Sequence, residues 1–302
     1  MTTEWASVAR GTSAFLRLIR FSHTLFALPY AVTGALLGVS NRGGFGKIPW
    51  TTLPLVLVCM VTARTAAMTF NRWVDRRFDA LNPRTMGRPS VTGEVAPRTM
   101  VVVTVVASAA FVAAAYGLNP LCGALSPIAL ATVLGYSFMK RVGWACHFVL
   151  GAALGLSPVG AYLAVGGAWD IGTAGIVAMG VAVCMWTAGF DVIYACQDVD
   201  HDRALGLHSI PARFGISGAL SAARGFHALV PPALAFAGGA LGLGTVYFVG
   251  VVAVMILLVY EHRLVKADDL RAVDTAFFTV NVAISLLVLS TSVADLWIGG
   301  RL

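Results

Sequence analysis

Two acid-rich segments contain the side chains best suited to chemistry. The first runs from Asn71 to Asp79 and includes Asp75; the second runs from Asp191 to Asp202. Together they hold six of the 14 acidic residues, and each lies where a long hydrophobic run ends. Hard divalent cations such as Mg2+ bind carboxylate oxygens and then bind substrate phosphates. The pattern predicts an enzyme that acts on a diphosphate at a membrane surface.

The spacing within the first segment places its polar side chains together. Asn71, Asp75 and Asp79 follow one another at intervals of four residues. On a helix such residues share one face and lie about 6 Å apart along the axis. We therefore predict that all three contribute to a metal site.

The second segment shows a similar pattern. Asp191, Asp198 and Asp202 are spaced i, i+7 and i+11, which again is one helical face, whereas Asp200 points away from it. If the helices that carry the two segments face each other, two rows of carboxylates meet across a cleft, and Mg2+ with a diphosphate would neutralise them. We predict Asp198 and Asp202 as further metal ligands, and Asp75, Asp191 and Asp198 as catalytic residues.

Asp191 lies two turns inside from Asp198, deeper than the predicted ligands. A carboxylate there could orient an acceptor hydroxyl or take a ring proton, or it could support the metal from outside its coordination sphere. For both segments the alternative is a set of salt bridges at a loop surface. Those would involve nearby arginines, namely Arg72, Arg76, Arg77 and Arg203.

A diphosphate with Mg2+ still carries negative charge, so we expect cations around it. Candidates are Arg72, Arg88, Lys140 and Arg141; the last two could instead only anchor the membrane boundary. Arg64 lies about two turns inside a hydrophobic run, where a lone Arg is costly. It shares a face with Asn71 and is predicted to serve the site, with intrahelical carbonyl or Ser/Thr pairing as the alternative.

Histidines enter these predictions at one position only. Arg20 and His23 open the first hydrophobic run and could meet the anion of a second substrate, or simply reach toward the membrane surface. His147, His227 and His262 have no ligand partners at a recognisable spacing and are interpreted as structural.

The elements that position these residues are membrane helices. The chain has 302 residues, 58% hydrophobic and 12% charged, with a mean hydropathy of +0.81. Soluble domains carry about 25% charged residues. The first 17 residues are mixed and polar, so we expect no cleaved signal peptide. The five cysteines show no metal-ligand spacing, and the net charge of +7 is explained by basic loops rather than by nucleic-acid binding.

Hydrophobic runs long enough to cross a bilayer predict nine transmembrane helices and one domain over residues 1–302. The expected spans are 21–40, 51–70, 98–116, 119–138, 143–165, 171–193, 224–242, 244–260 and 273–297. With the N-terminus in the cytoplasm, seventeen of the 21 Lys and Arg residues fall on the cytoplasmic side. That bias predicts a multi-pass protein of the cytoplasmic membrane whose acidic segments both lie on the cytoplasmic side. The unit of span, acidic segment and basic loop occurs twice, as in a weak internal repeat.

At these residues the chain resembles the UbiA superfamily of intramembrane aromatic prenyltransferases. Asn71-x3-Asp75-x3-Asp79 is similar to the first aspartate motif of the family, and Asp198-x3-Asp202, preceded by Asp191 and Tyr194, is similar to the second. Tyr136-Ser137 followed by Lys140-Arg141 resembles the basic segment after the fourth helix. Where many members have Asp directly after the Asn, this chain has Arg72, which leaves the ligand count open.

The resemblance implies an all-α fold and the transfer of a polyprenyl group from polyprenyl diphosphate to an aromatic acid, with Mg2+ as cofactor. The variant of the first span is similar to 4-hydroxybenzoate polyprenyltransferases and menaquinone-pathway naphthoate prenyltransferases, both in quinone biosynthesis. The residue pattern and the resemblance together predict diphosphate contacts from Arg64, Arg72, Lys140, Arg141, Tyr136 and Ser137. Acceptor contacts would come from Arg20, His23 and Tyr194, and aromatic shelter for an allylic cation from Tyr194, Trp186 and Phe190.

Two other functions remain open from the sequence. One is a UbiA-type enzyme with a non-quinone acceptor. The other is a secondary transporter, which also has intramembrane charges and a repeat; the position of the acids at one membrane face argues against it.

Overall fold

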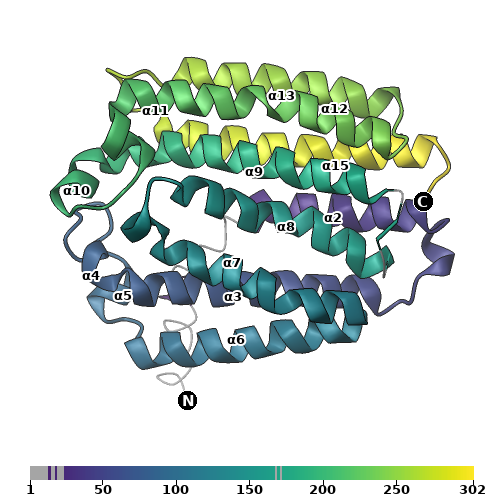
Figure 1. Ribbon diagram of the computed structural model, residues 1–302, viewed down its shortest axis with the longest axis horizontal. Coiled ribbons are helices and arrows are strands. Elements are labelled where there is room, and N and C mark those ends of the chain that lie inside the picture. Colours follow the sequence, from purple (N-terminus) through teal and green to yellow (C-terminus); the bar gives the residue numbers. More distant parts are fainter. Residues whose placement is uncertain (1–12, 15–17, 19–23, 167–168, 171) are drawn as a thin grey trace, which may run out of the picture.

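The structure is a computed structural model that describes residues 13–14, 18, 24–166, 169–170 and 172–302. Over these residues the regular structure is helical, with no β-strand. Figure 1 shows long helices lying side by side, with the short helices α4 (Arg76–Asp79), α5 (Pro89–Thr92) and α10 (Val199–Ala204) gathered at one end. Helices suit a bilayer because each satisfies its own backbone hydrogen bonds. The predicted all-α membrane bundle is confirmed at this level.

The remaining helices have the following bounds. The long ones are α2 (Thr24–Asn41), α3 (Thr52–Val74), α6 (Pro97–Leu118), α7 (Pro120–Val142), α8 (Cys146–Gly166), α9 (Thr173–Ala195), α11 (Ile210–Ala228), α12 (Val230–Ala240), α13 (Thr245–Leu264) and α15 (Asn281–Ile298). The short ones are η2 (Phe45–Lys47), η3 (Cys196–Asp198), α14 (Val273–Thr275) and η4 (Ala276–Val280).

Seven helical segments within the described residues are long and apolar enough to cross a membrane. They are Thr52–Val74, Pro97–Leu118, Pro120–Val142, Cys146–Gly166, Thr173–Ala204, Thr245–Leu264 and Val273–Ile298. The chain is therefore an integral, multi-pass membrane protein.

Two of the nine predicted spans differ from the helices observed. The apolar part of α2 that the structure describes, Phe26–Asn41, is short for a span. The predicted span 224–242 is not one helix, because α11 ends at Ala228 and α12 begins at Val230. Pro231 and Pro232 follow this break, and a proline has no backbone N–H to donate to the preceding turn. Seven of the nine expected spans therefore correspond to long apolar helices, and the count of nine stays a prediction.

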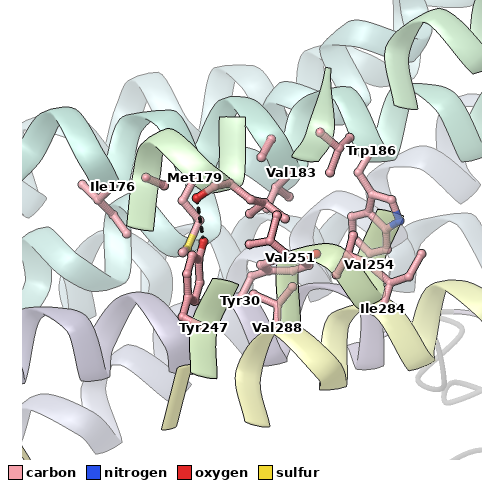
Figure 2. Close-up of a cluster of buried hydrophobic side chains, with 14 of the residues drawn as sticks. Tyr30, Ile176, Met179, Val183, Trp186, Tyr247, Val251, Val254, Ile284 and Val288 are labelled. Carbon is pink, nitrogen blue, oxygen red and sulfur yellow. Dashed lines mark hydrogen bonds between the residues drawn. The ribbon is translucent and has the colours of Figure 1, made fainter. Parts of the chain in front are cut away.

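The core of the bundle is built around α9. Trp186 and Met179 are fully buried, and they pack with Tyr30 of α2, Tyr247 of α13 and Ile284 of α15 (Figure 2). These five side chains come from four helices that are far apart in the sequence. Tyr30, Tyr247 and Ile284 pack against α9 and so help to fix its position. This is the helix that leads into the second acidic segment.

Small residues let α8 approach α9 closely. A methyl group added to Gly151 would lie 2.4 Å from the carbonyl oxygen of Cys184, and one added to Gly155 would lie 2.5 Å from that of Gly180. Interfaces between membrane helices favour glycine for this reason. The result is a closely packed α8–α9 pair.

A buried polar network lies beside this core. The indole Nε1 of Trp186 donates to Oδ1 of Asn281 at 2.6 Å, and Nδ2 of Asn281 donates to Oε1 of Glu261 at 3.0 Å. His227 and His262 lie 3.0 Å apart, ring nitrogen to ring nitrogen. From the sequence we interpreted these two histidines as structural. In the structure they contact each other rather than the acidic segments.

Candidate active site

The first acidic segment spans the end of α3 and the short helix α4. Asp75 lies where α3 ends, and its backbone N–H still donates to the carbonyl of Asn71, at 2.9 Å. The backbone N–H of Asp79 likewise donates to the carbonyl of Asp75, at 2.8 Å. Helical spacing is therefore retained across the junction, so the three polar side chains stay on one side as predicted.

The second acidic segment follows α9 through a tighter turn. Asp191 lies on α9, Asp198 ends the 3-10 turn η3, and Asp202 lies on α10. Asp198 and Asp202 are buried, whereas Asp200 is exposed, as its position in the pattern predicted. The helix tightens between Asp191 and Asp198, yet both carboxylates still reach the same cavity.

That cavity has a volume of about 280 Å³ and lies at the end of the bundle where α4, α5 and α10 gather (Figure 1). Its lining includes all the predicted acidic and diphosphate-binding residues. These are Arg64, Asn71, Arg72, Asp75, Asp79, Tyr136, Ser137, Lys140, Arg141, Asp191, Asp198 and Asp202. The two segments therefore meet at one cavity, as the sequence predicted, although α3 packs mainly against α6 and α7 while α9 packs against α8, α11 and α12.

Asp75 is held between an amide and a guanidinium. Nδ2 of Asn71 donates to its Oδ2 at 2.8 Å, and Nη2 of Arg141 donates to its Oδ1 at 2.9 Å. Burial and the neighbouring charge of Asp79 raise the pKa of Asp75, although Arg141 opposes them. A metal cation in the place of Arg141 would likewise stabilise the charged form of this carboxylate.

Asp79 lies against two arginines. Nη1 of Arg88 donates to its Oδ1 at 2.5 Å, and Nη1 of Arg72 lies 3.9 Å from its Oδ2. That Oδ2 atom is buried and makes no hydrogen bond. A buried carboxylate oxygen without a donor is costly, so it is an available ligand position in this cavity.

Asp198 accepts hydrogen bonds from the loop that follows the first segment. Nδ2 of Asn82 donates to its Oδ1 at 2.9 Å, and Nε of Arg84 donates to the same atom at 3.0 Å. A second nitrogen of Arg84 pairs with Oδ2, and Nη1 donates to the hydroxyl of Tyr194 at 2.6 Å. Burial lowers the pKa of Arg84, but the hydrogen bond and charge of Asp198 outweigh it, and the net shift is upward.

The fourth carboxylate, Asp202, pairs with the end of α7. Nζ of Lys140 lies 3.2 Å and 3.4 Å from the two oxygens of Asp202. The backbone carbonyl of Lys140 also accepts from the N–H of His208, at 2.6 Å. Lys140 therefore ties α7 to the second acidic segment.

Of the salt bridges considered as an alternative, the described residues show only the contact between Arg72 and Asp79. Nε of Arg76 donates to the carbonyl of Ser90, and Nε of Arg203 donates to that of Ala212. Arg77 is exposed and does not line the cavity. Of these four arginines, only Arg72 approaches a carboxylate. The other cations that reach the acids come from the loop after α4 and from α7.

Asp191 has a partner that the sequence did not suggest. Nδ1 of His147, which is fully buried on α8, lies 2.6 Å from Oδ2 of Asp191. His147 was interpreted as structural because its partner is 44 residues away and on another helix. No spacing rule within one element could have indicated this pair.

One end of the cavity is aromatic. The rings of Phe26, Phe190 and Phe277 lie within 5.4–5.7 Å of one another, centroid to centroid, and Tyr194 lies 4.2 Å from Phe277. Trp186 does not line the cavity; it lies behind Phe190, at 4.9 Å. Of the three aromatic residues predicted to shelter a cation, two line the cavity, and Phe26 and Phe277 join them.

Sequence reasoning missed some cavity residues and could not place others. Asn82 and Arg84 were not assigned, although Arg84 belongs to the basic loop after the first segment. Thr85 was also missed and carries no recognisable signal. Arg20 and His23, predicted to bind an acceptor, lie outside the residues that the structure describes.

The donor set suits a hard divalent cation shared with a phosphate. Carboxylate oxygens from both segments line the cavity, and the unbonded Oδ2 of Asp79 is among them. Among the described residues, no three His, Cys, Asp or Glu side chains converge on one ion position. Mg2+ typically uses one or two carboxylates and completes its shell with water and substrate phosphates, so the residues fit that arrangement and not a cage made by protein alone.

Comparison with known proteins identifies the family of this chain. Residues 24–284 match the UbiA prenyltransferase family. The chain is 34% identical to the 4-hydroxybenzoate octaprenyltransferase of Aeromonas salmonicida, over 80% of this chain and 83% of that one. It is 29% identical to the protein of the same name from Chromohalobacter salexigens, over 94% and 93% of the two chains.

Solved structures show the same fold. A UbiA homolog from Aeropyrum pernix superposes with a TM-score of 0.80 at 33% identity, covering 91% of this chain and 98% of that one. A UbiA homolog from Archaeoglobus fulgidus, bound to DMAPP and Mg2+, superposes with a TM-score of 0.74 at 20% identity, covering 94% and 99%. Because the family model matches residues 24–284 and a relative 34% identical covers 80% of this chain, the chain belongs to the UbiA prenyltransferase family.

Proposed function

We propose that this protein transfers a polyprenyl group from polyprenyl diphosphate to an aromatic acid, either 4-hydroxybenzoate-like or dihydroxynaphthoate-like, in quinone biosynthesis. The observation that carries the proposal is one cavity with two ends. One end holds five carboxylates and six cations, and the other holds four aromatic rings. A diphosphate and an allylic chain need opposite environments within a few ångströms, and this cavity offers both.

The polar end would hold the diphosphate. We assign Mg2+ to the carboxylates of Asp75, Asp79, Asp198 and Asp202 with Asn71; when bound, the cation neutralises charge on the diphosphate leaving group. The guanidinium and ammonium groups that now pair with these carboxylates would move to the phosphate oxygens. Arg84, Arg88, Arg141 and Lys140 are such groups, since each already contacts a carboxylate in the cavity. Tyr136 and Ser137 line the same wall.

The aromatic end would stabilise the allylic cation. When the carbon–oxygen bond to diphosphate breaks, positive charge develops on the prenyl carbon, and aromatic faces attract cations. Phe190, Phe277 and Tyr194 surround that part of the cavity. The isoprenoid tail would continue along Phe26 and the apolar side chains beside it.

The acceptor ring then attacks the cation, a carbon–carbon bond forms, and the ring loses a proton. We assign orientation of the acceptor hydroxyl or removal of that proton to Asp191, whose carboxylate lines the cavity. Arg20 and His23 remain candidates for binding the acceptor carboxylate. Asp191→Asn is expected to slow prenylation while leaving Mg2+-dependent donor binding intact.

We further propose nine membrane crossings in one prenyltransferase domain, with α2 and the kinked α11–α12 unit as the two crossings beyond the seven long ones. The family match runs without interruption over residues 24–284, which supports one domain. The excess of Lys and Arg on the side of the acidic segments supports a cytoplasmic active site.

The test uses purified full-length protein in lipid nanodiscs with radiolabelled geranyl diphosphate and Mg2+. Acceptors are supplied singly: 4-hydroxybenzoate, 1,4-dihydroxy-2-naphthoate and glycerol 1-phosphate. Transfer of label to either aromatic acid, abolished by a chelator and restored by Mg2+, is the expected result. Transfer only to glycerol phosphate would contradict the aromatic acceptor. Movement of labelled compound across sealed vesicles without diphosphate release would favour a transporter.

A further inference from the structure

His147 is held at both ring nitrogens. It is fully buried near the start of α8, next to the cavity-lining residue Cys146. Its Nδ1 lies 2.6 Å from Oδ2 of Asp191, and its Nε2 lies 3.3 Å from the backbone nitrogen of Ile210. An imidazole with both nitrogens engaged has one orientation in the fold.

These two contacts determine which nitrogen carries the proton. The backbone N–H of Ile210 can only donate, so Nε2 of His147 must be the acceptor and carries no hydrogen. In the neutral ring the proton is then on Nδ1, which donates to the carboxylate of Asp191. The histidine is therefore a hydrogen-bond donor aimed at the proposed acceptor-side carboxylate.

The carboxylate of Asp191 is thereby tethered at one oxygen only. Its side chain is 24% exposed, and no second hydrogen bond to it is present among the described residues. The remaining oxygen is available to the cavity that Asp191 lines. A carboxylate fixed at one oxygen and open at the other suits the orientation of a substrate hydroxyl.

The support behind His147 is itself anchored. The N–H of His208 donates to the carbonyl of Lys140 at 2.6 Å, and the thiol of Cys146 contacts the carbonyl of His208 at 3.6 Å. The hydroxyl of Ser209 accepts from the N–H of Ala212 and caps α11. The segment that presents the N–H of Ile210 is thus fastened to both α7 and α11, so it can hold the imidazole in place.

We propose that His147 is a positioning residue: as the Nδ1–H tautomer it fixes the carboxylate of Asp191 so that its free oxygen meets the aromatic acceptor. The proposal rests on the proposed function of Asp191. It assigns His147 no contact with the donor diphosphate, because His147 does not line the cavity. Its loss should therefore affect the acceptor half of the reaction and spare the donor half.

The test compares two variants of similar length, His147→Met and His147→Gln. Glutamine has an amide that can donate to Asp191 and accept from Ile210, whereas methionine has no donor. For His147→Met we expect kcat/KM for the acceptor to fall about tenfold or more, as for loss of a hydrogen bond to a charged group, with the donor KM unchanged. His147→Gln should recover most of that loss.

Three outcomes would overturn the proposal. The first is unchanged acceptor kinetics in His147→Met. The second is a donor KM that rises in parallel with the loss of acceptor kinetics. The third is a glutamine variant no better than the methionine variant, although both keep the melting temperature of the wild type. Any of them would return His147 to a structural role.

A second measurement does not depend on turnover. Protein labelled with 15N-histidine is compared with His147→Gln by solid-state NMR, which assigns the His147 signals by their loss. A protonated Nδ1 with an unprotonated Nε2 is expected; an Nε2–H tautomer or a doubly protonated ring contradicts the proposal. Absence of transfer by the wild type, with the expected tautomer, would contradict the proposed function instead.

Discussion

Arg84 and Asp198 form a two-pronged ion pair that joins segments 114 residues apart. The guanidinium comes from the loop after α4, and the carboxylate ends the turn after α9. The same arginine donates to the hydroxyl of Tyr194 at the edge of the aromatic end. This one side chain therefore links the two acidic segments and the two ends of the cavity.

Replacing Arg84 by Gln should weaken use of the donor. The neutral amide keeps a hydrogen-bond donor but removes the charge available to a diphosphate, so kcat/KM for the donor is expected to fall about tenfold or more, the size of a lost charge-assisted bond. The measurement is steady-state kinetics with varied geranyl diphosphate. Arg77→Gln is the matched control, since Arg77 is exposed and outside the cavity. Equal losses in both variants would contradict a specific role for Arg84.

Neutralising the proposed metal ligands should stop turnover. Asp198→Asn and Asp75→Asn keep side-chain size and hydrogen bonding, but each removes a charge that Mg2+ needs. Activity is expected to fall at least a hundredfold, and chelators should have little further effect. Asp200→Asn, at the exposed position of the same segment, should retain nearly full activity. Normal turnover in either of the first two variants would rule out that residue as a metal ligand.

Lys140→Ala should raise the donor KM by about tenfold while kcat falls less. Lys140 pairs with Asp202 at the cavity wall, so at the proposed site its charge would be close to the diphosphate in the ground state as well as in the transition state. Initial rates at saturating acceptor measure both constants. Lys266→Ala, which removes an exposed basic residue of another loop, is the control. A donor KM that stays constant would limit Lys140 to membrane anchoring.

Glycines on α8 offer a test of helix packing. Gly155→Ala would place a methyl group 2.5 Å from the carbonyl oxygen of Gly180, whereas Gly160→Ala meets nothing within 4 Å. Overpacking costs about 1–3 kcal/mol, while alanine in an open helical position gains about 0.5–1 kcal/mol over glycine. We expect a lower melting temperature in detergent for Gly155→Ala and an unchanged or higher one for Gly160→Ala. The opposite order would contradict the close approach of α8 and α9.

Local pattern was enough for the acidic segments. The intervals from Asn71 to Asp79 place three polar side chains on one helical side, and the structure keeps them there because the backbone hydrogen bonds continue through Asp75. The exposed position of Asp200 follows from the same periodicity. Hydropathy alone identified the long membrane helices, because a bilayer requires about 20 apolar residues for each crossing.

The sequence was less informative where two features compete. The run at 224–242 is mostly apolar, yet Pro231 and Pro232 interrupt it, because a ring nitrogen without hydrogen cannot continue the helical bonding. The hydropathy of this run shows its apolar character but not where the helix breaks. The helix boundaries there depend on the backbone chemistry of those prolines.

Pairs between distant helices were decided only by the tertiary structure. Arg84 meets Asp198 and His147 meets Asp191 because the bundle places their helix ends and loops together, and nothing in the spacing along one helix encodes such a neighbour. The same reason moved Trp186 behind Phe190 and brought Phe26 and Phe277 into the aromatic end. The sequence by itself determined which chemistry the chain can supply and on which membrane helices it lies. Tertiary packing decided which cation faces which carboxylate, since that depends on distances across the bundle.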